Sequence, residues 1–111
     1  MGRSHRPMPE RLAEKLYFIR RHLDLTQEQM VERLESKLRE NFQDEVSLYP
    51  GHISEYERGR REPPLTVLLQ YARLAEVPLE NLVDDGLDLP GFYFRYVLEK
   101  SMREESKKRK T

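Results

Sequence analysis

The sequence contains no cysteine, and this absence excludes both a disulfide framework and any metal site built on thiolates. Its three histidines are scattered without metal-ligand spacing, and no glycine-rich phosphate loop is present. Adjacent carboxylates occur at 84–85 and 104–105, but no pocket signature surrounds them. We therefore expect no cofactor, no metal and no catalytic residues, and the chain is not predicted to be an enzyme.

Long apolar runs are also missing. No stretch approaches the ~18 apolar residues that a membrane-spanning helix needs, and residues 1–7 lack the apolar segment of a signal peptide. We therefore expect a cytoplasmic protein with no membrane partner.

A third feature that the sequence lacks is an excess of either charge. The 20 Lys and Arg residues balance 20 Asp and Glu residues, so the formal net charge is zero, which is unusual for a nucleic-acid-binding protein. The charges are nevertheless segregated, because residues 76–89 are acidic without a basic residue, whereas residues 100–110 are rich in Lys and Arg. A neutral chain of this kind can still carry a basic face.

The 111 residues, 37% hydrophobic and 36% charged, suffice for one domain with a small core. Apolar residues recur at helical spacing, which predicts an all-α fold of five short helices. We expect a disordered, proline-containing arm over residues 1–8 and a folded domain over residues 9–85. Residues 86–111 are expected to form a C-terminal helix and a basic tail.

The first helix is predicted over Pro9–His22. Leu12, Leu16 and Ile19 repeat at i, i+4 and i+7, so they form its buried stripe. The opposite, solvent-exposed face is expected to carry the charged residues Arg11, Glu14, Lys15, Arg20 and Arg21.

The second helix has the clearest local signal in the chain. Thr26 can serve as N-cap and Gln29 can return the hydrogen bond, which is a capping box. Leu25 and Met30 have the spacing of the accompanying hydrophobic staple. The apolar stripe continues far enough to predict a helix to about Glu40, followed by a polar loop over residues 41–48.

The stretch from Tyr49 to Pro64 predicts a third helix of about two turns, with Pro50 at its first position and Gly59 just past its end. Ile53 and Tyr56 can face a core. The small or hydrogen-bonding residues that then point outward are Gly51, His52, Ser54 and Glu55, followed by three arginines at 58, 60 and 61. This pattern is typical of a DNA recognition helix, and it also fits a surface helix with solvated charges.

Two further helices are predicted, over Leu65–Ala75 and Leu79–Val83. The buried face of the first should consist of Leu65, Leu68, Leu69 and Ala72. An acidic linker then leads to an aromatic-rich helix from residue 91, which could cover the domain's own core or form a dimer interface.

The order of these elements resembles the Xre/Cro-type helix-turn-helix family of bacterial and phage transcriptional regulators. The resemblance covers about Leu12 to Asp85. It is carried by Leu25-Thr26-Gln27-Glu28-Gln29 at the second helix, by the Tyr-Glu-Arg-Gly string that begins at Tyr56, and by the pair of helices that closes the domain.

The resemblance implies a five-helix, lambda-repressor-like domain that places its third helix in the major groove of double-stranded DNA. By position, the base-reading residues are Pro50, Gly51, His52 and Glu55. The phosphate contacts fall on Arg20, Gln27, Arg58, Arg60 and Arg61. The resemblance also implies that Glu57 is a structural, hydrogen-bonding residue and not a DNA contact.

The chain departs from the family in three places. Val31 stands where the family usually has Ala, an insertion over residues 35–48 replaces the usual Gly, and Pro50 stands where Gln is common. Proline cannot make the bidentate contact with adenine that Gln makes, so these departures leave the base readout open.

Two functions follow as hypotheses. The first is a sequence-specific transcriptional regulator, a repressor that binds a palindromic operator as a homodimer, because one short helix reads too few bases. The alternative is a protein-interaction module, as in an antitoxin, with a protein partner on the altered third helix.

Overall fold

The computed structural model describes residues 8–42 and 47–90, and every regular element in these residues is a helix. The helices are α1 (Leu12–His22), α2 (Gln27–Phe42), α3 (Pro50–Glu57), α4 (Leu65–Ala75) and α5 (Glu80–Val83). The prediction of an all-α fold with five helices is therefore confirmed. Residues 1–7 of the arm predicted over residues 1–8, and the C-terminal helix and basic tail predicted from residue 91, lie outside the described residues.

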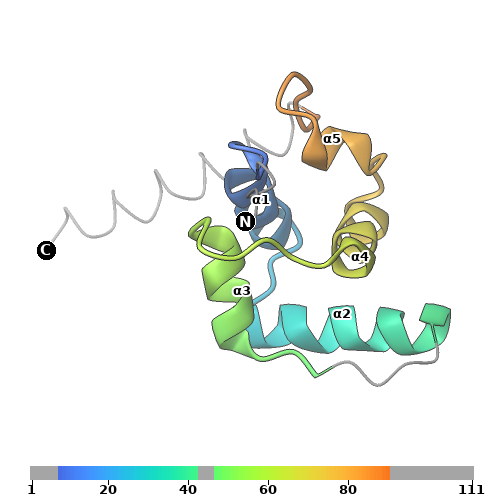
Figure 1. Cartoon of the computed structure of the whole chain (residues 1–111). Coiled ribbons are helices and arrows are strands. Elements are labelled where there is room, and N and C mark those ends of the chain that lie inside the picture. The colour runs from blue at the N-terminus through green and yellow to red at the C-terminus, as the bar shows by residue number, and fades with distance from the viewer. Residues whose placement is uncertain (1–7, 43–46, 91–111) are drawn as a thin grey trace, which may run out of the picture.

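The first turns of α2 lie against α3, whereas its second half extends beneath α4 (Figure 1). The predicted stripes of α1 and α2 are buried, and they meet Ile53 and Tyr56 from α3 in a single core. Small domains of this size depend on such a shared core, because no helix of 8 to 16 residues is stable alone in water. The core therefore sets the orientation of α3.

The buried face of α4 differs from the prediction. Leu65 is 69% exposed, whereas Val67 and Tyr71 are buried together with the predicted Leu68 and Ala72. This helix is apolar around most of its circumference, so two overlapping stripes satisfy helical periodicity equally well. The packing of α4 against α1 and α2 selects one of them, which no local signal indicates.

The capping box that begins α2 is present as predicted. Thr26 Oγ1 accepts from the backbone N–H of Gln29 at 3.1 Å, and Gln29 Oε1 accepts from the backbone N–H of Thr26 at 2.9 Å. Met30 is buried, and Leu25 packs against the core beside it. These contacts fix where α2 begins, and with it the approach of α2 to α3.

Three helices end with a residue in the left-handed conformation. Gly59, at φ 71°, follows α3, and the N–H of Arg60 donates to the carbonyl of Glu55 at 2.9 Å. Asp24 (φ 58°) and Glu76 (φ 59°) end α1 and α4 in the same way. Glycine adopts this conformation without strain, whereas the other two residues adopt it at a cost.

Lys15 contradicts the prediction of an exposed charged face on α1, because its side chain is fully buried. Its ammonium group donates to the carbonyl oxygens of Asn81, Asp84 and Leu87 at 2.7, 3.0 and 2.7 Å. Burial lowers the pKa of Lys15, and the three carbonyls supply the partners that a buried ammonium requires. Lys15 therefore anchors α5 and the segment after it to α1.

The acidic segment after α5 is docked rather than a free linker. Asp85 accepts from the backbone N–H groups of Glu10 and Arg11, both at 2.9 Å, so it caps the start of α1. Arg11 in turn donates to the carbonyl of Asp85 and pairs with Asp88. The two backbone hydrogen bonds, that of Arg11 foremost, lower the pKa of Asp85.

The insertion after Leu34 is partly helical and packs within the domain. The helix α2 continues to Phe42, two residues beyond the expected end, and Leu38 is buried. Asn41 donates to the side chain of Gln70 in α4 at 3.1 Å, and Glu35 accepts from the backbone N–H of Leu48 at 3.1 Å. The insertion thus lengthens α2 and leaves α3 against its first turns.

Candidate nucleic-acid interface

Glu57, the last residue of α3, connects three helices. Its carboxylate accepts from Arg20 of α1 at 2.6 and 2.9 Å and from the side-chain amide of Gln27 at 3.3 Å. The third guanidinium nitrogen of Arg20 donates to the carbonyl of Leu25 at 2.9 Å. Burial alone would lower the pKa of Arg20, but the hydrogen bonds and charge of Glu57 raise it. Glu57 thus has the structural role that the resemblance implies.

This arrangement positions the start of α2 beside α3. Gln27 is the first residue of α2, where unpaired backbone N–H groups carry a partial positive charge that favours an anion such as a phosphate. Gln27 and Arg20, both predicted phosphate contacts, lie together on Glu57. Arg20 already donates through all three nitrogens within the protein, and its contact with phosphate stays a prediction.

The first turn of α3 offers an open surface. Pro50 and Gly51 are exposed, and a Cβ atom added at Gly51 would meet nothing within 4 Å. No other part of the described domain packs against this turn at Gly51. Another macromolecule can therefore approach the α3 backbone closely at this point.

His52 caps the helix on which it lies. Its Nδ1 atom accepts from the backbone N–H of Tyr49 at 3.2 Å, and the two rings lie 5.5 Å apart. Because Nδ1 acts as acceptor, the proton of the neutral imidazole is assigned to Nε2. His52 thus combines a structural bond at one nitrogen with a donor at the other.

Glu55 and Arg61 form an ion pair of 2.7 Å on the surface. The hydrogen bond from Arg61, followed by its charge, lowers the pKa of Glu55, so the carboxylate is ionised at neutral pH. The resemblance implies that Glu55 reads bases and that Arg61 binds phosphate, and in the structure these two side chains pair with each other. In the described residues, the side chains of Arg58 and Arg60 are exposed and no ion pair holds them.

The structure adds one residue that the sequence reasoning missed. Tyr49 immediately precedes α3, is 62% exposed and lies beside His52. An exposed aromatic ring at the edge of an open helix start can contact a ligand or a base. In the sequence, only the position of Tyr49 directly before Pro50 points to the site, because the pattern around a single aromatic residue does not show whether its side chain is buried or exposed.

The described residues give no support for a metal site or for a membrane-spanning helix. Within 8–42 and 47–90, no cluster of three potential metal ligands occurs. No helix in these ranges has the length and apolar character required to cross a bilayer.

Comparison with known proteins gives one match. A family model described as "Helix-turn-helix domain" matches residues 13–85, which include all of α2 through α5 and nearly all of α1. No curated protein and no solved structure matches the chain significantly. The family indicates a DNA-binding regulator in general terms, with no activity as an enzyme implied. Because the match covers well over half of the sequence, this chain belongs to the helix-turn-helix domain family.

Proposed function

We propose that the protein is a sequence-specific DNA-binding transcriptional regulator of the Xre/Cro type. In this proposal it acts as a repressor, binds a palindromic operator as a homodimer, and inserts α3 into the major groove. The observation that carries the proposal is the open first turn of α3, on a helix whose last residue, Glu57, is hydrogen-bonded to Gln27 at the start of α2. In a helix-turn-helix, the N-terminal residues of the second helix contact base edges, while the first helix crosses the DNA backbone.

Base reading in this proposal depends on two polar side chains. Pro50 and Gly51 offer no side-chain donor or acceptor for bases, but their small exposed surface lets the backbone approach the groove. His52 can donate from Nε2 to a base acceptor, and Glu55 can accept from a cytosine amino group. The two residues are three positions apart on α3, so they reach neighbouring base pairs.

Phosphate binding is assigned to the arginines after α3 and to the start of α2. Arg58 and Arg60 are exposed, and Arg61 can exchange its bond with Glu55 for a phosphate oxygen. Gln27 supplies a side-chain amide at a helix N-terminus. Arg20 contributes chiefly by holding α1, α2 and α3 together through Glu57 and the Leu25 carbonyl.

Binding-site selection with the full chain tests this function. We expect enriched half-sites related by two-fold symmetry and spaced by about one helical turn, roughly 10 base pairs. Affinity for the selected site should fall steeply with salt, because phosphate contacts release counterions. Failure to enrich any sequence, together with salt-independent binding, would contradict the proposal.

The antitoxin-like interaction module has one observation in its favour. The ion pair between Glu55 and Arg61 neutralises part of the face that would meet DNA, on a protein with zero formal net charge. If a protein partner were the target, DNA binding would be weak and without sequence preference even at low salt. The same selection and salt titration therefore separate the two functions.

A further inference from the structure

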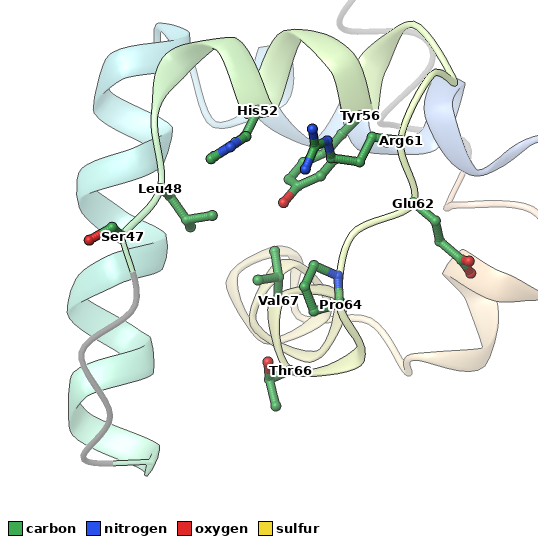
Figure 2. A pocket seen from close by; sticks show the side chains of 9 residues that line it. All are labelled: Ser47, Leu48, His52, Tyr56, Arg61, Glu62, Pro64, Thr66 and Val67. Carbon is green, nitrogen blue, oxygen red and sulfur yellow. The ribbon is translucent and has the colours of Figure 1, made fainter.

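A cavity of about 360 Å³ lies between α3, the first turn of α4 and the segment that precedes α3 (Figure 2). Its volume is at the lower end of the range for small-molecule sites in proteins, roughly 300–1,000 Å³. Neither the helix-turn-helix assignment nor the proposed DNA contacts give this cavity a role. Its walls differ in chemistry, which indicates what it can bind.

One wall consists of hydrogen-bond donors. The side chain of Tyr56 is buried, its hydroxyl points into the cavity in Figure 2, and no hydrogen bond to that hydroxyl occurs within residues 8–42 and 47–90. Burial raises the pKa of Tyr56, so the hydroxyl keeps its proton at neutral pH. His52 adds the Nε2–H group, since Nδ1 is occupied by the Tyr49 N–H.

Arg61 supplies the positive charge at this wall. Only its Nε atom is bonded to Glu55, so the two terminal nitrogens of the guanidinium remain for another acceptor. Among the described residues that line the cavity, the one acidic residue is Glu62, whose carboxylate points away from the space (Figure 2). The wall therefore favours a negatively charged acceptor, and a planar carboxylate matches the guanidinium best.

The opposite wall is apolar. Leu48 and Val67 are buried residues whose side chains face the space, and Pro64 lies beside Val67 (Figure 2). An ion without an apolar part would leave this surface in contact with water. A compact apolar group attached to a carboxylate would cover it and gain the free energy of burial.

We propose that this cavity binds a small organic anion, a carboxylate on a compact aromatic or aliphatic body. The carboxylate accepts from Arg61, Tyr56 and His52, and the apolar body lies against Leu48 and Val67. Bound in this way, the anion occupies the two terminal nitrogens of Arg61, which its bond to Glu55 leaves available. It also accepts from the Nε2–H group of His52, the same donor that the proposed base contact uses.

Such a ligand would act as an effector that weakens DNA binding. Two of the residues that hold it, His52 and Arg61, are those proposed to read a base and to bind phosphate. This consequence rests on the proposed function, whereas the site itself does not. The site is therefore tested first on the free protein.

Titration of the ¹⁵N-labelled full chain with benzoate, followed by NMR, tests the site. We expect saturable shifts that cluster at the backbone amides around Leu48, His52, Tyr56 and Val67. Benzamide, which has the same shape without the charge, should bind several-fold more weakly. Shifts without saturation, or spread over the exposed arginines, would overturn the proposal as an unspecific effect of charge.

Three variants sharpen this test. Arg61→Gln should weaken benzoate binding about tenfold, and Tyr56→Phe a few-fold, since each removes one hydrogen-bonding group and retains the packing. Arg73→Gln is the matched control, because Arg73 is an exposed arginine of α4 that does not line the cavity. Equal affinities of Arg61→Gln and Arg73→Gln would overturn the assignment.

A second measurement tests the effector role. Saturating benzoate should lower the affinity of the wild-type protein for its selected DNA site, and Arg61→Gln should show a smaller response. Unchanged DNA affinity with the cavity occupied would overturn the effector role. If the wild-type protein bound no DNA, the proposed function would fail, while the NMR titration would still decide whether the cavity is an anion site.

Discussion

Arg20 and Glu57 form a bidentate ion pair, at 2.6 and 2.9 Å, between residues that lie 37 positions apart in the sequence. Their side chains are only 11% and 7% exposed. The pair joins α1 to the end of α3, and through Gln27 it includes the start of α2. One carboxylate therefore links all three helices, in addition to the core that they share.

Removing this carboxylate should cost much stability. Glu57→Ala leaves the Arg20 guanidinium nearly buried without its anion, and such a loss typically costs about 3–5 kcal/mol. Urea unfolding followed by circular dichroism measures the free energy of unfolding. Glu40→Ala is the control, because its pair with Lys37 is exposed, 3.5 Å long and should contribute less than about 0.5 kcal/mol. Similar losses for both variants would show that the Arg20–Glu57 pair has no special role.

The cap that Asp85 places on α1 predicts a dependence of stability on pH. Its pKa is lowered in the folded protein, so its contribution is complete above the unfolded-state value of about 3.9 and is lost as pH falls through the folded-state pKa. Asp85→Asn should therefore lower the melting temperature at pH 7. As the pH falls from 7 through the folded-state pKa of Asp85, the melting temperatures of the variant and the wild type should converge, because the wild-type carboxyl then becomes protonated and uncharged as well. A melting-temperature difference that stays constant over this pH range would contradict the role of the ionised cap.

The left-handed residues that follow α3 and end α4 predict two changes in stability. Introducing glycine at position 76 should stabilise the protein, and removing glycine at position 59 should destabilise it. Glu76→Gly should raise the free energy of unfolding by about 1 kcal/mol, because glycine adopts φ 59° without the steric cost that Glu76 bears. Gly59→Ala should lower it by about 1 kcal/mol. A Cβ atom at position 59 would lie 3.7 Å from that of Ala13, so backbone strain and not a clash is the cause. Chemical denaturation of both variants checks the signs.

Arg58 should contribute affinity for DNA without sequence preference. Arg58→Ala is expected to weaken specific and non-specific binding alike and to reduce the slope of log affinity against log salt by about one. Fluorescence anisotropy over a salt series measures both quantities. An unchanged slope would show that α3 does not dock with its C-terminal end on the phosphate backbone.

The sequence-based expectations were correct where the interacting residues are close in the sequence, and wrong where they are far apart in the sequence. The capping box of Thr26 and Gln29 and the glycine at 59 are local, and both were predicted because their partners lie within a few residues. Lys15 was misassigned because its three carbonyl partners lie 66 to 72 residues away. The face of α4 could not be predicted either, since several neighbouring positions are equally apolar.

In the candidate site, too, the short-range features could be predicted from the sequence and the long-range features could not. The exposed start of α3 and the arginines after it could be placed from helix boundaries alone. The pairing of Glu55 with Arg61 depends on the path of the chain after Gly59, and the cavity depends on how α4 and the segment at Leu48 pack against α3. Neither feature has a sequence signature.

The ion pair of Glu55 and Arg61 leads to the sharpest prediction about specificity. Glu55 is repelled by phosphate, so it should penalise wrong sites as well as reward a cytosine. Glu55→Ala should relax base preference at one or two positions per half-site. It should also raise non-specific affinity, because it removes a negative charge and releases Arg61 for a phosphate contact. His52→Ala, in contrast, should lose about 1–3 kcal/mol of specific affinity.

A double-mutant cycle separates the two effects of Glu55. If the released Arg61 causes part of the gain in non-specific affinity, that gain should be smaller when Glu55→Ala is introduced into an Arg61→Ala background. Binding-site selection on the single variants reports the base preference, and anisotropy with a random duplex reports non-specific affinity. Identical gains in both backgrounds would mean that Arg61 does not reach phosphate. Unchanged selected sequences for Glu55→Ala and His52→Ala would move the base readout away from these side chains, to DNA shape or to another part of the chain.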